Sequence, residues 1–267
     1  MSIYADLHIH TTNSDGTLTL EDLPAVANEY DISVVAVTDH DRIHPDISDP
    51  IIQVEDVIII HGIELRVQIA SQRIDLLGYG VTSTSTLRAE INRLQNNRVQ
   101  RAKRIVEQIE EHLNITLDVE YHRGIGRPHI ARAVINHPDT SLSYDEVFDE
   151  LIGEGKPCYV ARNIPSFSKG HSILTEACSV VGLAHPFRYD DPESALEVTT
   201  ELDAVERYYP YDQPDSAIRN DLLETIMNQH DLLPIGGSDA HNEVIGKTGL
   251  NEAEYQDFAA ALTNSMS

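Results

Sequence analysis

Short apolar runs rich in β-branched residues recur along the chain and alternate with amphipathic stretches. The apolar runs at 3–7, 33–37, 57–60, 181–184, 204–206 and 232–235 read as buried strands. Apolar residues with helical spacing occur at 20–30, 192–200, 215–229 and 252–262. Strands that alternate with helices are typical of a parallel sheet or a barrel. Residues 66–70 and 73–79 flank a Ser71-Gln72 turn and predict a hairpin.

The middle of the chain departs from this alternation. Apolar residues recur at helical spacing and predict one long helix over 87–113: Leu87, Ile91, Leu94, Ala102, Ile105 and Ile109. Two further helical stretches lie around 130–136 and 144–152. We therefore predict a mainly helical insertion at 86–159, and we assign 1–85 and 160–267 to the domain that contains the sheet.

The chain is strongly acidic. Its 267 residues include 19 Lys and Arg against 44 Asp and Glu, which gives a formal net charge of −25 at pH 7. This charge repels nucleic acid and anionic membranes, so we expect no membrane partner and no stable binding of duplex nucleic acid. An acidic surface with few lysines also suits a cytoplasm of high salt. On composition alone, a halophilic source and a non-halophilic source are equal alternatives.

Cysteine content and the first residues indicate a cellular compartment. Only Cys158 and Cys178 occur, too few for a disulfide scaffold and without the spacing of a thiolate zinc site. The segment from Met1 to His8 has neither the basic nor the apolar part of a signal peptide. No apolar run approaches the ~20 residues that span a bilayer. We expect a soluble cytoplasmic protein.

Nearly half of the basic residues fall in one stretch of the chain: Arg88, Arg93, Arg98, Arg101, Lys103, Arg104, Arg123, Arg127 and Arg132. We expect most of them to form a solvated helix face with nearby acidic partners such as Glu107 and Glu111. A helix that binds nucleic acid is the alternative, and the net charge of the chain opposes it.

Residues of the types that bind metals follow the predicted strands. His8 and His10 stand two positions apart on the first strand, so their side chains share one face. Later strands end in Thr38-Asp39-His40-Asp41, Gly62-Ile63-Glu64, Ala184-His185-Pro186 and Gly237-Ser238-Asp239-Ala240-His241. Functional groups of parallel α/β folds gather at this rim, which predicts a metal centre of imidazoles and carboxylates. The other histidines lack such a position and receive no role: His44, His61, His112, His122, His137, His171 and His230.

Together with Ser14-Asp15-Gly16, these motifs resemble the polymerase and histidinol phosphatase (PHP) family. Gly126-Arg127-Pro128-His129 further resembles the branch of that family with a helical cap domain, which includes nucleotide phosphatases and 5′-to-3′ exonuclease-like enzymes. The resemblance implies a distorted (β/α)7 barrel of the PHP type, with up to three divalent metal ions at its C-terminal rim. It assigns His8, His10, Glu64 and Asp239 to one metal, Glu64, His129 and His185 to a second, and Asp15, His40 and His241 to a third.

The expected ligands are nitrogen and oxygen atoms without thiolate, which suits Mn²⁺, Zn²⁺ or Fe²⁺, and we favour Mn²⁺. We expect Arg127 and Arg188 to contact phosphate oxygens, with a structural salt bridge as the alternative for each. Asp41 is a candidate for donating a proton to the leaving group or for orienting a histidine, with a helix or turn cap as the alternative. Asp6 and Asp39 are candidates for orienting the histidines.

The sequence therefore predicts a metal-dependent phosphoesterase that acts on a small phosphorylated metabolite. Adjacent divalent cations lower the pKa of bound water toward ~7 and so provide hydroxide at neutral pH. A nucleotide, a nucleoside 3′,5′-bisphosphate or a short 5′-phosphorylated oligonucleotide is the preferred substrate, because the insertion contains Arg127 and His129. A histidinol-phosphate phosphatase and a non-catalytic metal-binding module are the alternatives, and the complete ligand set argues against the second.

Overall fold

The computed structural model describes residues 2–70, 72–211 and 217–264 of the chain. The chain forms two compact units, one of Met1–Arg88 and Ile164–Ser267 and the other of Ala89–Asn163. Each unit has a hydrophobic core of its own, as expected of a domain. Within the described ranges, no helix combines the length and the apolar character that a membrane span requires.

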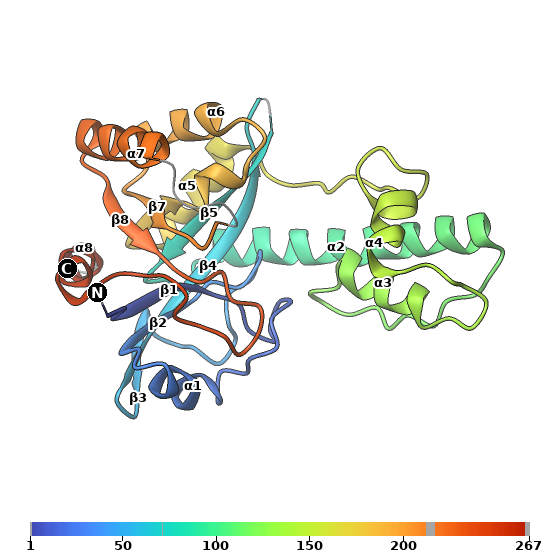
Figure 1. Ribbon diagram of the computed structural model, residues 1–267, viewed down its shortest axis with the longest axis horizontal. Coiled ribbons are helices and arrows are strands. Elements are labelled where there is room, and N and C mark those ends of the chain that lie inside the picture. The colour runs from blue at the N-terminus through green and yellow to red at the C-terminus, as the bar shows by residue number, and fades with distance from the viewer. Residues whose placement is uncertain (1, 71, 212–216, 265–267) are drawn as a thin grey trace. The chain divides into compact units, whose positions relative to one another are not determined.

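The first unit is built on one curved sheet (Figure 1). Its strands are β1 (Ala5–Ile9), β2 (Val34–Val37), β3 (Ile51–Val54), β4 (Val57–Gln68), β5 (Arg73–Tyr79), β6 (Val180–Leu183), β7 (Ala204–Tyr208) and β8 (Leu233–Gly236). Their order is β1-β2-β4-β5-β6-β7-β8, with β3 paired to β4. Strand β5 is antiparallel to both of its neighbours, and the other pairings along this order are parallel. The C-terminal ends of β1, β2, β4, β6, β7 and β8 therefore lie along one rim.

The two ends of the sheet approach each other, so that the sheet nearly closes into a barrel. Strand β1 contacts β8, and an isolated bridge joins Ile9 to Ala240. Gly237 permits this approach, because a Cβ atom there would lie 2.3 Å from the backbone nitrogen of His8. The near closure brings the segment after β8 to the end of β1.

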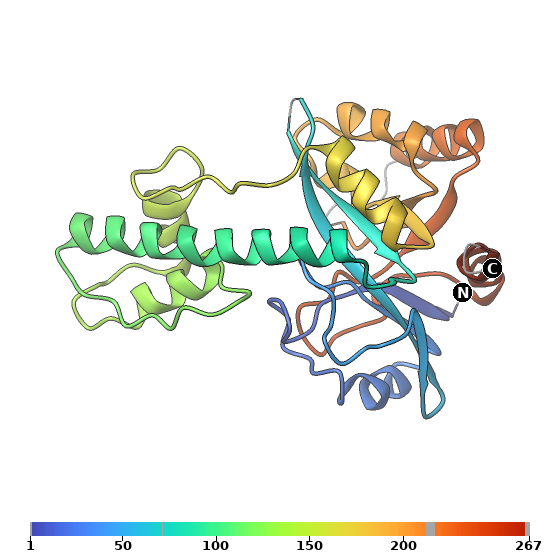
Figure 2. The ribbon, with the colours of Figure 1, turned by 180° about the vertical axis from the view of Figure 1, so that it is seen from behind.

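Buried aliphatic side chains stabilise the central strands of the sheet. Every residue of β1 and β2 is buried, which is typical of parallel strands covered on both faces. The rings of Tyr79 and Phe258 meet edge to face at 5.2 Å within one core cluster. The helices of this unit are α1 (Leu23–Glu29), α5 (Phe167–Ala177), α6 (Pro192–Leu196), α7 (Ala217–His230) and α8 (Glu252–Asn264), with 3₁₀ turns η2 (Pro186–Arg188) and η3 (Glu197–Glu201). Helix α5 contacts β4 and β6 (Figure 2).

The second unit is helical. Its elements are α2 (Ser85–Leu113), whose first residues belong to the other unit, α3 (Arg127–Ile135), α4 (Tyr144–Glu146) and the π-helical segment η1 (Val147–Ile152). Ile105 and Ile109 of α2 pack with Ile130 and Val134 of α3 in its core. The helical spacing predicted for the long helix therefore corresponds to a buried stripe.

Arg101 of α2 is an exception to the solvated basic face that we expect of most of these residues. Arg101 is only 8% exposed, and its Nε donates to the carbonyl of Val160 at 2.6 Å. Burial, together with the charges of Arg127 and Arg162, lowers the pKa of Arg101 to about 9. Helical spacing alone does not distinguish such a buried cation from the solvated ones.

The predicted architecture, a distorted α/β barrel with a mainly helical insertion, is confirmed. The hairpin is also confirmed, since β4 and β5 pair across residues 69–72. The strand predicted over 57–60 is wrong in length: β4 continues to Gln68 because β5 pairs with its second half. Glu64 consequently lies inside a strand and not at a strand end.

Other predicted elements differ in smaller ways. The pattern does not predict the edge strand β3, which is poorly buried, or helix α5. The helix expected over 192–200 is divided into α6 and η3. The helix expected over 215–229 corresponds to α7, and its first two predicted residues lie outside the described ranges.

Candidate metal centre

Imidazole and carboxylate side chains gather at the rim of the first unit. The rim contains His8 in β1, His10 and Asp15 after β1, His40 after β2, Glu64 in β4, His185 after β6, and Asp239 and His241 after β8. These strands run in one direction, so their C-terminal parts meet at one end of the barrel. Eight of the nine predicted metal ligands thus lie at one end of a single unit.

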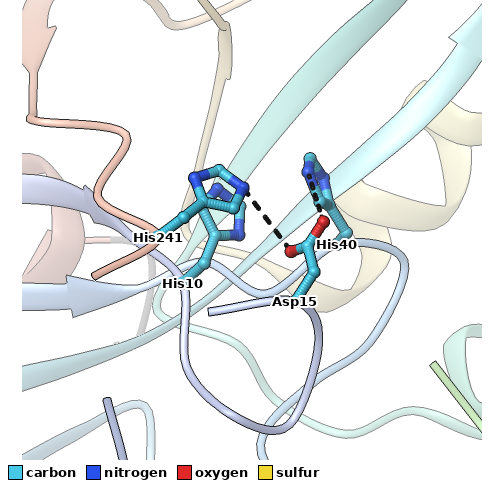
Figure 3. A group of neighbouring side chains, drawn as sticks. All are labelled: His10, Asp15, His40 and His241. Atoms are coloured by element: carbon cyan, nitrogen blue, oxygen red, sulfur yellow. Dashed lines mark ion pairs between the residues drawn. The ribbon is translucent and has the colours of Figure 1, made fainter. Parts of the chain in front are cut away.

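Three groups among the described residues bring ligand atoms within 4.8 Å of one another. They are His10, Asp15, His40 and His241 (Figure 3), then His8, His10 and Asp239, and finally Glu64, Asp75 and His185. The side chain of His241 is 40% exposed, whereas the third group is buried. The rim therefore offers both an accessible and a buried place for a cation, linked by His10 and Glu64.

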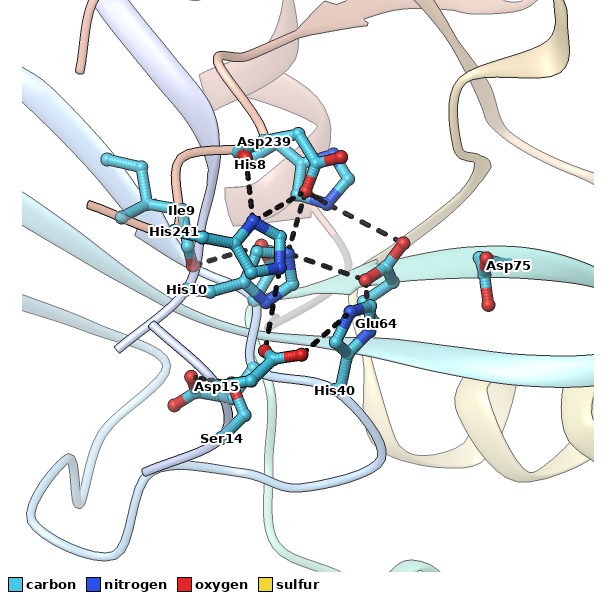
Figure 4. Close-up of polar contacts among 12 residues, drawn as sticks. His8, Ile9, His10, Ser14, Asp15, His40, Glu64, Asp75, Asp239 and His241 are labelled. Carbon is cyan, nitrogen blue, oxygen red and sulfur yellow. Dashed lines mark hydrogen bonds and ion pairs between the residues drawn. The ribbon is translucent and has the colours of Figure 1, made fainter. Parts of the chain in front are cut away.

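Glu64 lies close to the imidazoles of His8, His10 and His40 (Figure 4), and that of His185 is also near. Its Oε1 lies 3.0 Å from Nε2 of His185 and 3.6 Å from Nε2 of His8. Its Oε2 lies 2.5 Å from Nδ1 of His40 and 3.5 Å from Nε2 of His10. A carboxylate with both oxygens among such donors can bridge adjacent cations, as in two-metal sites.

The buried donor atoms fit a divalent metal ion. Nε2 of His8 is buried and has no hydrogen-bond partner among the described residues. It lies 3.6 Å from Glu64 and 3.5 Å from Asp239, while Nδ1 of the same ring donates to Glu206 at 3.0 Å. Leaving such an atom unsatisfied costs about 1–3 kcal/mol. A cation held by these groups would satisfy it, and a donor set of imidazoles and carboxylates suits Mn²⁺, Zn²⁺ or Fe²⁺.

Neighbouring charges keep the carboxylates of the site ionised. Burial alone would raise the pKa of Glu64 and of Asp239. Several neighbours together outweigh burial: the charges of His40 and His8, with hydrogen bonds from His185 and His40, lower the pKa of Glu64, and the charges of His8 and His10, with the hydrogen bond from His10, lower that of Asp239. Burial likewise opposes protonation of His40, but Glu64 raises the pKa of this imidazole to about 9. Burial and the His40 charge lower the pKa of His10. Metal binding displaces the imidazole protons, because only the neutral ring is a ligand.

Three residues of the rim adopt a left-handed backbone: Asp41 (φ 52°), His185 (φ 28°) and Asp239 (φ 47°). Such conformations cost about 1–3 kcal/mol each and persist where the surroundings hold them. The backbone nitrogen of His185 donates to Glu206 at 2.6 Å, and that of Asp41 donates to the Glu64 carbonyl at 2.7 Å. Strain of this kind clusters at functional sites.

Two buried aspartates fix the loops that contain ligands. Asp6 accepts hydrogen bonds from the backbone nitrogen and the hydroxyl of Ser238, at 2.9 and 2.5 Å, after β8. Asp39 accepts from the backbone nitrogen and hydroxyl of Thr11, at 2.8 and 2.7 Å, and from the hydroxyl of Ser14 at 2.6 Å. These contacts fix the loops through their backbone and hydroxyl groups, and the predicted role of the two aspartates in orienting the histidines stays a prediction.

Two of the predicted catalytic residues lie at this rim. Nη1 of Arg188 donates to Oδ2 of Asp239 and to the Tyr209 hydroxyl, both at 2.9 Å, and the Arg188 side chain is 52% exposed. An accessible guanidinium therefore lies beside a metal-binding group. Asp41 is 1% exposed, and its side chain accepts a hydrogen bond from the backbone nitrogen of Arg66 at 3.2 Å. A contact of this kind with a backbone nitrogen resembles the cap that was the alternative for Asp41. Its role as a proton donor stays a prediction.

The remaining two predicted residues, Arg127 and His129, belong to the second unit, at the start of α3. Nη1 of Arg127 donates to the Ile152 carbonyl at 3.2 Å, and the guanidinium lies 5.5 Å from the ring centre of Phe148. Nδ1 of His129 accepts from the backbone nitrogen of Gly126 at 3.2 Å, which favours a proton on Nε2. The phosphate contact of Arg127 and the ligand role of His129 stay predictions.

The sequence analysis did not identify Asp75 as a residue of the metal centre. It lies near the beginning of β5, and its carboxylate receives two hydrogen bonds from the Arg66 guanidinium, at 2.7 and 2.6 Å. Because β5 is reversed, its beginning lies at the rim. The predicted hairpin did not reveal this pair, because counting back from a two-residue turn at 71–72 pairs Arg66 with Leu77, whereas the observed register pairs Arg66 with Asp75.

Glu206 and Tyr209 also escaped prediction. Glu206 is fully buried in β7 and contacts His8 and the backbone of His185. The hydroxyl of Tyr209 donates to Oδ2 of Asp239 at 2.9 Å. A carboxylate at the end of an apolar strand is an informative anomaly, because buried Glu is rare without a partner.

Several known proteins are similar to this chain in sequence or in fold. The family model described as the PHP domain matches residues 6–153. The chain is 28% identical to the 5′-3′ exoribonuclease Rnm of Escherichia coli strain K12, over 90% of this chain and 86% of the relative. It is 25% identical to the 3′,5′-nucleoside bisphosphate phosphatase of Chromobacterium violaceum, over 72% of this chain and 70% of the relative. A solved structure from Bifidobacterium adolescentis, described as a metal-dependent phosphoesterase, has a TM-score of 0.78 and 22% identity, covering 98% of this chain and 97% of that chain.

Proposed function

The chain belongs to the PHP domain family, and we propose that it hydrolyses a phosphate ester of a nucleotide, a nucleoside 3′,5′-bisphosphate or a short 5′-phosphorylated oligonucleotide. The match over residues 6–153 confirms the family that the motifs predicted. The relatives have the names of hydrolases that act on phosphate esters, and the chain is accordingly a metal-dependent phosphoric ester hydrolase.

One observation carries the proposal: three neighbouring groups of imidazoles and carboxylates share one rim, with Glu64 and His10 among them. In our proposal these residues hold two or three divalent ions. Bound there, such ions supply an activated water and neutralise the oxygens of a phosphoryl group. We favour Mn²⁺ because carboxylates contribute to every group, with Zn²⁺ and Fe²⁺ as alternatives.

The protein side chains contribute orientation and charge. Arg188 has accessible nitrogen atoms beside Asp239, and a guanidinium binds two phosphate oxygens in a fixed geometry. The local positive charge of Arg188 and of the metals offsets the net charge of −25 for an anionic substrate. Two relatives support a nucleotide substrate, since one is named an exoribonuclease and the other a nucleoside bisphosphate phosphatase.

A substrate panel tests the proposal. Chelator-treated protein is reloaded with Mn²⁺, Zn²⁺ or Fe²⁺ and incubated with a nucleoside 3′,5′-bisphosphate, a nucleoside monophosphate, a 5′-phosphorylated oligoribonucleotide and histidinol phosphate. Released phosphate and nucleotide products are measured by colorimetry and chromatography. We expect products from at least one of the nucleotide substrates. Turnover of histidinol phosphate alone, or of none, contradicts the proposal.

We also propose that the second unit acts as a cap domain and that the protein is cytoplasmic. The expected substrates are small phosphorylated molecules, and neither a membrane nor duplex nucleic acid is an expected partner. A filter-binding assay with duplex DNA, at low salt and with chelator, checks the last point.

A further inference from the structure

We propose that Glu206 is a positioning residue that aligns ligands of two metal-binding groups, through the ring of His8 and the backbone of His185. The inference rests on the proposed function only in so far as the rim binds metal. Glu206 belongs to none of the groups whose ligand atoms converge, and its two carboxylate oxygens contact nitrogen atoms of two ligands.

The first contact fixes the tautomer of His8. Oε1 of Glu206 accepts from Nδ1 of His8 at 3.0 Å, and both side chains are fully buried. A carboxylate at this distance holds a proton on Nδ1, so the neutral ring that binds a metal has its lone pair on Nε2. That lone pair belongs to the buried atom without a hydrogen-bond partner among the described residues, 3.5 Å from Asp239 and 3.6 Å from Glu64.

The second contact holds the turn that contains His185. Oε2 of Glu206 accepts from the backbone nitrogen of His185 at 2.6 Å. His185 has φ 28°, a conformation that non-glycine residues rarely adopt and that needs support from its surroundings. The same residue directs its Nε2 toward Oε1 of Glu64 at 3.0 Å. Loss of the backbone contact would let the turn relax and move this nitrogen away.

The two contacts together make Glu206 a link between separate groups. His8 belongs with His10 and Asp239, whereas His185 belongs with Glu64 and Asp75. A carboxylate is suited to this link because both oxygens accept hydrogen bonds, and an amide has only one acceptor oxygen. Glu206→Gln therefore keeps the size of the side chain and loses one of the two contacts.

Metal binding by Glu206→Gln tests the inference without any substrate. The variant and the unaltered protein are titrated with Zn²⁺ against a competing chelator, and with Co²⁺ while the visible absorption bands are recorded. We expect affinity to fall about 10–100-fold, the usual effect of removing a partner of a metal-binding histidine. Asp203→Asn is the matched control, since Asp203 precedes β7 and accepts from the backbone nitrogen of Val181 at 2.9 Å. We expect the control to bind with unaltered affinity.

The tautomer of His8 provides a second measurement. Long-range ¹H–¹⁵N correlation spectra of the protein with ¹⁵N-labelled histidine show which ring nitrogen has the proton, and the signals are assigned by their loss in His8→Gln. We expect a proton on Nδ1 in the unaltered protein, both with Zn²⁺ and after chelation. This measurement needs no folded Glu206→Gln.

Two results overturn the inference. One is a folded Glu206→Gln variant with unaltered metal affinity, and the other is an unaltered protein in which Nδ1 of His8 has no proton. If the protein binds no divalent metal, the proposed function is overturned instead. The NMR spectrum recorded after chelation still shows whether Nδ1 of His8 has the proton that the contact with Glu206 requires.

Discussion

Oε1 of Glu64 lies 3.0 Å from Nε2 of His185, although 121 positions separate the two residues along the chain. Strand β5 lies between their strands in the sheet, and its reversed direction returns β6 to the orientation of β4. The contact therefore depends on the complete order of the sheet. Glu64 also faces His8, His10 and His40, so a change at this one carboxylate reaches every metal-binding group.

Glu64→Gln should abolish most of the activity. The amide is neutral and a poor metal ligand, and removing a ligand should cost at least the ~100-fold that a ligand's own partner can cost. We expect phosphoesterase activity to fall by at least this factor and the bound metal per chain to decrease. Metal content and initial rates measure both effects. Glu254→Gln is the control, since Glu254 binds the Tyr208 hydroxyl outside the metal-binding groups. Equal activity of the two variants would contradict the role of Glu64.

Arg188→Met should weaken the productive binding of substrate. A hydrogen bond from a charged donor contributes roughly 1.5–3 kcal/mol, which corresponds to a decrease in kcat/KM of about 10–100-fold. Arg207→Met is a close control, because Arg207 also lies over a tyrosine ring and pairs with a carboxylate, that of Glu224. We expect this control to retain its kcat/KM, measured with the best substrate of the panel. If both variants lose the same amount, Arg188 has no specific contact with phosphate.

Arg66→Gln should destabilise the metal-free protein more than the metal-loaded one. The substitution removes both hydrogen bonds to Asp75, whose side chain is 1% exposed, and leaves a buried carboxylate without its cation. Breaking a buried pair costs about 3–5 kcal/mol, and we expect roughly 2 kcal/mol because the Arg66 side chain is 35% exposed. A metal ion bound by Glu64, Asp75 and His185 would replace the lost charge. Urea unfolding with chelator and with Mn²⁺ measures the difference, and identical losses in both conditions would argue against a cation beside Asp75.

His61 should make the protein less stable in mild acid. The residue is 2% exposed, and neither ring nitrogen has a hydrogen-bond partner among the described residues. Burial, assisted by the charge of His44, lowers the pKa of His61 to about 4, whereas the unfolded pKa is about 6.5. As the pH falls from about 6.5 to about 4, His61 binds a proton in the unfolded chain but stays neutral in the folded chain. The free energy of unfolding should therefore decrease by up to about 3 kcal/mol between pH ~6.5 and ~4.

His61→Leu isolates this contribution. Both proteins are unfolded by urea at several pH values with chelator present, so that the other titrating groups contribute alike. We expect the stability of the variant to depend less on pH. Parallel pH profiles of the two proteins would show that the pKa of His61 is the same in the folded and the unfolded chain, which contradicts the prediction.

Salt should stabilise the protein. A net charge of −25 on 267 residues produces self-repulsion in the folded state, and added salt screens it. We expect the Tm to increase when KCl is raised from about 0.1 M to about 2 M, the direction that a halophilic source implies. Differential scanning fluorimetry of the metal-loaded protein measures this shift, with sucrose as an uncharged control. A Tm that is constant or falls with KCl would contradict the halophilic expectation.

The sequence by itself determined most of the candidate metal ligands at the rim, although not Asp75. Apolar runs identify β1, β2 and β6, and the polar residues beside them, such as His10, His40 and His185, share an edge because parallel strands end together. The period of two along a strand likewise placed His8 and His10 on one face. These inferences need only local pattern and strand direction.

Only the tertiary structure decided which side chains meet. The reversal of β5 brought Asp75 to the rim, the closure of β8 onto β1 brought Asp239 to His10, and the burial of Glu206 connected His8 to His185. Contacts of this kind depend on strand order, register and closure. Those features arise from packing between segments far apart in the chain, and no local pattern of residues encodes them.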